Sequence, residues 1–157
     1  MGLDMYFNLK KREYTSVIRK NLIAFPPAIE QIIRGDGDLY KYAEISTSYS
    51  VGYLRKANAI HSWLVDNCHN EIDDCSEFVI PIKRLVELED IIHEVICDKE
   101  KAETLLPTRE GFLFGSLDYD EYYFKDLDYM YNLLVKVIDF LNGEDGKEYE
   151  FTYQASW

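Results

Sequence analysis

Residues 49–67 have the sequence YSVGYLRKANAIHSWLVDN, and this stretch contains the change of pattern that decides the fold. The residues up to position 53 are rich in Tyr, Ser, Thr, Ile and Val, which favours a strand over residues 42–53 that Gly52 ends. Beyond it the apolar side chains recur at helical spacing, which predicts a helix of about four turns over residues 54–67. The core face of that helix has three apolar residues: Ala57, Ile60 and Leu64.

The same two patterns account for the chain on either side of this stretch. Alternating apolar and polar residues predict strands over residues 5–14, 77–82 and 148–153. A stripe of apolar residues at helical spacing predicts a helix over residues 83–106, which Pro107 stops. A second stripe predicts a helix to residue 142, started by a capping box at 118–121 and followed by Gly143 as its cap. The last stripe has six members: Phe124, Leu127, Tyr131, Leu134, Ile138 and Leu141.

These elements predict an α+β fold: a single domain, 1–157, with about three main helices packed on a small, mostly antiparallel sheet. The length of 157 residues suits one domain. Residues 15–40, which contain Phe25-Pro26-Pro27 and the turn GDGD, form an expected insertion on that domain.

Composition excludes several classes of function. The net charge of −12 repels phosphate backbones, so we expect no direct nucleic-acid binding. No stretch approaches the roughly 20 apolar residues that span a bilayer, and the first residues lack the order of a secretory signal. We therefore expect no membrane partner and a cytoplasmic protein.

Signatures of metal and catalytic chemistry are missing from the sequence. Cys68, His69 and Cys75 could bind zinc, yet no CxxC or HxxxH pair supports such a site. There is no GxSxG, P-loop, HExxH or GxGxxG motif. We expect no cofactor, no metal and no catalytic residue, which favours a binding protein over an enzyme.

Polar and aromatic side chains are densest where the strand meets the helix. Two cations in the first turn, Arg55 and Lys56, could bind an anion together with free helix N–H groups. Asn58 and His61 lie three residues apart and could reach the same object. Three rings could stack on a planar base: Tyr49, Tyr53 and Trp63. The alternative is structural: solvated cations, a core tryptophan, and Asn58 and His61 bonded within the fold.

A second cluster covers residues 111–123, GFLFGSLDYDEYY. Its rings Phe112 and Phe114 could line a pocket, where Gly115 would let a ligand approach the backbone. Asp120 and Glu121 could accept hydrogen bonds from a base or a ribose. The alternative is a buried loop followed by an acidic helix start, which the helix dipole favours in any case.

Several of these motifs together resemble a family of small phage and prophage proteins. They are GLDMYF (2–7), GYLRKANAIHSWLVDN (52–67), DDC (73–75), and LP (106–107) with GFLFGS (111–116) and YDEY (119–122). The family brings no established reaction with it. By analogy, the resemblance implies an anti-defence role, since some phage proteins of this size sequester nucleotide immune signals such as cyclic oligonucleotides or ADP-ribose derivatives.

Three functional hypotheses follow. The first is a protein that captures a small anionic, nucleotide-like ligand and that we expect to form a homo-oligomer. The second is an acidic mimic of DNA that binds and inhibits a basic host protein. The third is a nucleotide-processing enzyme with His61 as acid–base.

Overall fold

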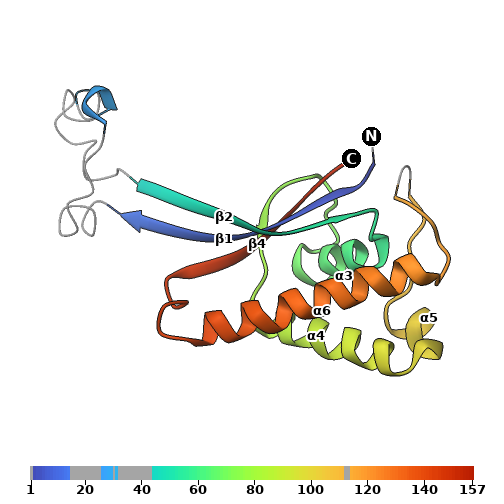
Figure 1. The fold of residues 1–157 in the computed structure, drawn as a ribbon. Helices are drawn as coiled ribbons and strands as arrows, with labels where there is room; N and C mark the ends of the chain where they lie inside the picture. The colour runs from blue at the N-terminus through green and yellow to red at the C-terminus, as the bar shows by residue number, and fades with distance from the viewer. Residues whose placement is uncertain (1, 15–25, 30, 32–43, 112–113) are drawn as a thin grey trace.

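A computed structural model of the chain describes residues 2–14, 26–29, 31, 44–111 and 114–157. It shows an α+β domain in which a four-stranded antiparallel sheet lies along one side of the helices (Figure 1). The strands are β1 (Asp4–Tyr14), β2 (Glu44–Arg55), β3 (Phe78–Val79) and β4 (Tyr149–Ser156). The helices are α3 (Asn58–Cys68), α4 (Ile82–Cys97), the short η2 (Lys99–Lys101) and α5 (Ala102–Leu105), and α6 (Glu121–Asn142).

The sheet has the order β2-β1-β4-β3, so the two ends of the chain pair in its centre. Asp4 of β1 lies opposite Ser156 of β4, and on its other side opposite Arg55 of β2. Met5 and Phe7 are fully buried while Tyr6 between them is exposed, as strand alternation requires. The expected strands over 5–14 and 148–153 are thus confirmed, and β4 continues to Ser156.

The helices cover the inner face of the sheet and close one hydrophobic core. The expected faces of the first two helices are confirmed, since Ile60 and Leu64 of α3 and Leu88 and Ile92 of α4 are buried. In α6 the stripe differs from the expected one, because only Leu127 and Leu134 of the six expected residues are fully buried. Three others complete the buried face: Tyr123, Met130 and Val137.

The prediction that Gly52 ends the strand and a helix begins at 54 is wrong. β2 continues to Arg55, because Leu54 pairs with Met5 of β1 and alternation already buries it. Lys56 then takes a left-handed conformation with φ of 63°, and its N–H donates to the Leu3 carbonyl. The helix starts only at Asn58, so Arg55 and Lys56 lie at the junction before it rather than in its first turn.

Two further helix boundaries differ from expectation. The helix expected over 83–106 is interrupted at Asp98, whose side chain accepts a hydrogen bond from the Glu100 N–H and starts η2. The capping residue of α6 is Asp120 rather than Asp118, because Asp120 Oδ1 accepts from the N–H groups of Tyr122 and Tyr123. Gly143 follows the last turn as expected.

The expected strand over 77–82 shortens to the two residues of β3. Most of the expected insertion, 15–40, lies outside the described residues.

Candidate functional site: a pocket between α3 and α6

A pocket of about 600 Å³ opens where the β2–α3 junction, the loop residues 108–111 and 114–118, and the first turns of α6 meet. Ligand sites commonly have volumes of about 300–1,000 Å³. Its walls come from two segments far apart in sequence, residues 55–60 and residues 108–127. The charged and aromatic lining residues are Arg55, Lys56, Phe114, Asp118, Asp120, Tyr122, Tyr123 and Asp126.

One wall of the pocket is cationic. Arg55 is just over half exposed, and its Nε lies 3.6 Å from the Asp4 carboxylate. Lys56 is exposed and has no ion-pair partner among the residues that the structure describes. Both cations are therefore accessible to an anion in the pocket.

The start of α3 adds backbone donors to the same wall. Ala57 precedes the helix without capping it through a side chain. Ala59 and Ile60 line the pocket, and in the described ranges their N–H groups have no hydrogen-bond acceptor. Free N–H groups at a helix start favour negative charge. This wall therefore suits a phosphate or a carboxylate.

Asn58 fixes the loop that forms the rim of the pocket. Its Nδ2 donates to the carbonyls of Phe114 (3.2 Å) and Ser116 (2.8 Å), and its Oδ1 accepts from the Arg109 N–H (3.1 Å). Because all three bonds are to backbone groups, Asn58 can hold the loop independently of the loop's side chains. Asn58 is 3% exposed, so it supports the site instead of presenting a free amide to a ligand.

Gly115 brings the same loop against the cationic junction. A Cβ on Gly115 would lie 2.9 Å from both the carbonyl oxygen and the Cβ of Lys56. Gly115 also has φ of 103°, a conformation that other residues rarely adopt. Gly115 therefore allows a close approach to the backbone, as expected, but the group that approaches is Lys56 of the protein and not a ligand.

The wall that the loop and α6 contribute is acidic and aromatic. Asp118, Asp120 and Asp126 line it with Tyr122 and Tyr123. Tyr123 is buried and donates its hydroxyl to the Leu106 carbonyl at 2.8 Å, whereas Tyr122 is 75% exposed. The Tyr122 ring is therefore accessible for stacking.

Asp126 is the carboxylate with the most unusual environment in this wall. It is half-buried on α6, and burial raises its pKa to about 6, with Asp120 adding to the rise and Lys125 opposing it. Among the described residues no hydrogen bond or ion pair engages its oxygens. A carboxylate with these properties in a pocket is a candidate for ligand recognition.

The structure brings five of the eleven expected site residues together: Arg55, Lys56, Asn58, Phe114 and Asp120. Phe112 lies outside the described residues. Five others lie elsewhere: Tyr49, Tyr53, His61, Trp63 and Glu121.

Those five residues have other surroundings. Tyr49 and Tyr53 are exposed on β2, where the Tyr53 hydroxyl bonds to Asp4. Trp63 is half-buried against the core. Glu121 lines a separate, more open depression with Lys99 and Lys125.

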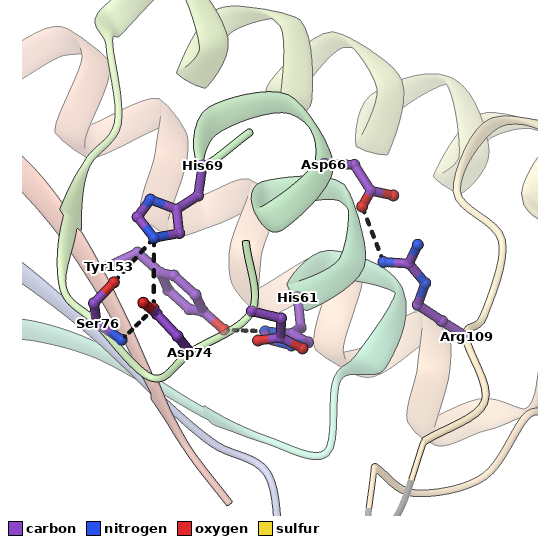
Figure 2. A network of polar contacts seen from close by, with 8 residues as sticks. His61, Asp66, His69, Asp74, Ser76, Arg109 and Tyr153 are labelled. Atoms are coloured by element: carbon purple, nitrogen blue, oxygen red, sulfur yellow. Dashed lines mark hydrogen bonds and ion pairs between the residues drawn. The ribbon is translucent and has the colours of Figure 1, made fainter. Parts of the chain in front are cut away.

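His61 does not line the pocket and belongs to a closed polar network with Tyr153 and Asp73 (Figure 2). It is 1% exposed, its Nδ1 lies 2.7 Å from the Tyr153 hydroxyl, and its Nε2 lies 3.2 Å from Asp73. Burial lowers its pKa below the ordinary value of 6.5, although Asp73 opposes this. The adjoining cavity is only about 10 Å³, so no substrate reaches this imidazole.

A second histidine, His69, lies near Ser76 and Asp74 in the same view (Figure 2). Its Nε2 is 2.9 Å from Ser76 Oγ and 3.6 Å from Asp74 Oδ1. A catalytic triad needs the serine and the acid on opposite ring nitrogens. Because both partners approach the same nitrogen, this trio is not arranged for nucleophilic catalysis.

The described residues contain no group of three or more His, Cys, Asp or Glu placed to hold a metal ion. Cys68, His69 and Cys75, which the sequence analysis considers as zinc ligands, therefore do not form such a group. Burial raises the pKa of the Cys68 thiol to about 11, which disfavours the thiolate that a metal would need.

Four charged or aromatic lining residues are not among the eleven expected site residues: Asp118, Tyr122 and Tyr123, which lie within the second cluster, and Asp126, which lies beyond it. In α6 the buried face includes Tyr123, Met130 and Val137 where the expected stripe has Phe124, Tyr131 and Ile138. Tyr122 and Asp126 are the neighbours of this observed face, since residues three or four apart lie side by side on a helix. The signal was therefore the alternative apolar stripe Tyr123, Leu127, Met130, Leu134 and Val137, which the sequence also contains.

Comparison with protein-family models, with curated proteins and with solved structures gave no match. In the described part of the chain, no helix has the length and apolar character needed to cross a membrane.

Proposed function

We propose that this protein binds a small, nucleotide-like anion in the pocket between α3 and α6. The observation that carries the proposal is the concentration of Arg55, Lys56 and the uncapped start of α3 on one wall. In a chain of net charge −12, two cations beside free N–H groups form a local site for negative charge.

The other walls complement the remainder of a nucleotide. Tyr122 offers an accessible ring for a base, and the aspartates offer acceptors for base or ribose donors. The pocket volume of about 600 Å³ is large enough for such a ligand.

Binding is better supported than acid–base catalysis by His61. Both nitrogens of that imidazole are engaged within the fold, and His61 does not line the pocket. A general base must come within hydrogen-bond reach of the substrate proton.

The resemblance to phage proteins extends the proposal to a biological setting. In that setting the protein is phage-encoded, acts in the host cytoplasm and sequesters a nucleotide-derived immune signal. Capture needs cations and rings but no catalytic group, which fits the pocket.

The proposal is tested by isothermal titration of the protein with nucleoside monophosphates at low salt. We expect saturable binding that weakens as salt increases, and Lys56→Gln to weaken it by about tenfold through loss of one charge-assisted contact. Lys83→Gln is the matched control, because Lys83 is an exposed lysine on α4 outside the pocket. The absence of binding by any nucleotide, or equal effects of the two substitutions, would contradict the proposal.

A further inference from the structure

The two walls of the pocket have opposite charge, and this polarity constrains what the pocket binds. Arg55 and Lys56 project from the β2–α3 junction, while Asp118, Asp120 and Asp126 come from the loop and α6. No ion pair joins the two walls among the described residues, since the pair that Arg55 makes is with Asp4. A ligand that fits both walls needs an anionic group at one end and hydrogen-bond donors at the other.

The three aspartates are not equally available to such donors. Asp120 uses Oδ1 to cap α6, and Asp118 uses Oδ2 to accept the Ser116 hydroxyl at 2.9 Å. In the described ranges Asp126 makes no such contact, so both of its oxygens remain available. Asp126 can therefore accept two hydrogen bonds side by side.

Asp126 also gains the most from a ligand's donors. A half-buried carboxylate without hydrogen bonds has lost part of its hydration, and no protein hydrogen bond compensates for that loss. The position of Asp126, three residues after Tyr123 and four after Tyr122, places it on the helix face that lines the pocket. A planar group stacked near Tyr122 can direct its edge at this carboxylate.

We propose that the pocket selects a guanine nucleotide, with Asp126 accepting from the N1–H and N2 amino groups of guanine and the phosphate bound beside Lys56. This inference rests on the proposed function and specifies its ligand. Guanine presents two adjacent donors, which match the two oxygens of one carboxylate. Adenine presents an amino group beside the lone pair of N1, so one carboxylate oxygen faces a repelling acceptor.

The test compares the binding of GMP, IMP and AMP at neutral pH by isothermal titration. IMP differs from GMP only in lacking the N2 amino group, so it isolates one of the two donors. We expect GMP to bind about tenfold more tightly than IMP, and AMP to bind more weakly still.

Asp126→Asn supplies the second arm. The amide of Asn has one acceptor and one donor, which suits the amino group and N1 of adenine. We expect the variant to lose about tenfold in GMP affinity and to gain in AMP affinity, with the fold checked by thermal unfolding. Lys56→Gln should weaken GMP and AMP alike, since it acts on the phosphate.

The outcomes separate the two proposals. If all three nucleotides bind equally, and Asp126→Asn changes none of them while Lys56→Gln weakens all, the guanine inference is wrong and the anion-binding function stands. If no nucleotide binds, both are wrong.

Discussion

Two polar regions lie next to α3, and they differ in how completely their groups are paired. In one, His61 is held between Tyr153 and Asp73 around a cavity of about 10 Å³. In the other, Lys56 and Asp126 line a pocket of about 600 Å³ without partners among the described residues. Both regions combine charge with aromatic rings, so composition alone does not distinguish them.

The difference teaches that a candidate site is recognised by unmet polar groups beside open space. In the His61 region each ring nitrogen has a partner and rings of Phe114 and Trp157 pack within 6 Å of the imidazole. Such a network stabilises the fold and leaves nothing for a ligand. In the pocket the same types of residue remain available, which is the condition for binding.

Asn58→Ala gives the largest expected effect, because Asn58 holds the backbone of Arg109, Phe114 and Ser116 at the rim of the pocket. The substitution leaves three backbone groups without their partner, which should lower the free energy of unfolding by about 3 kcal/mol. Urea denaturation measures the loss. A loss under about 1 kcal/mol would show that solvent replaces Asn58 easily and that the loop is not held by it.

His61→Ala tests whether the closed region is purely structural. The variant loses buried contacts and leaves the Tyr153 hydroxyl unpaired in the core, so stability should fall by about 2 kcal/mol. Nucleotide affinity, measured by titration at a temperature where the variant remains folded, should change little. A large loss of affinity with normal stability would place His61 in the functional site and invert the comparison.

Much of the fold could be predicted because strand alternation and helical stripes are local signals. β1, β4 and the buried faces of α3 and α4 follow directly from them. The end of β2 could not, because Tyr53 and Leu54 fit either period and pairing with β1 decides between them. The interruption at Asp98 was missed because no Gly or Pro marks it.

The cationic wall of the site could be predicted because Arg55 and Lys56 are adjacent in sequence. The acidic wall could not, because it depends on which face of α6 packs against the core. With Phe124, Tyr131 and Ile138 in the expected stripe, Asp126 was not assigned to a site, whereas Glu121 was assigned to one and lines a different depression. Tertiary structure, through the loop that Asn58 holds, then brings the two walls together.

Asp126→Asn tests the unpaired state of Asp126 through the pH dependence of the free energy of unfolding. The pKa of Asp126 is raised from 3.8 to about 6 in the folded protein, so the folded state holds this proton more tightly than the unfolded chain. Above pH 6 the charged carboxylate therefore lowers stability, and the variant should be more stable at neutral pH by about 1 kcal/mol after allowance for solvent screening. This gain should disappear as the pH falls below 6 toward 4.

The pH profile of unfolding, compared between the protein and this variant, isolates Asp126 from its neighbours. The charged residues that surround or face Asp126 are common to both proteins: Lys125, Asp120, Asp118, Arg55 and Lys56. His61 is also common to both and acts in the opposite direction: its lowered pKa stabilises the fold above pH 6.5, and this contribution is lost as the pH falls. A difference between the profiles that does not change with pH would contradict the raised pKa of Asp126.

Arg55→Ala has the smallest expected effect on stability and the clearest one on function. Arg55 is mostly in solvent and its pair with Asp4 is a surface ion pair, so unfolding should change by less than about 0.5 kcal/mol. Its loss from the cationic wall should still weaken nucleotide binding by about tenfold, since a charge-assisted contact to phosphate is lost. The contrast with His61→Ala, which should alter stability without altering affinity, is what assigns binding to one region and stability to the other. If Arg55→Ala lowered stability while leaving affinity intact, the two regions would exchange roles.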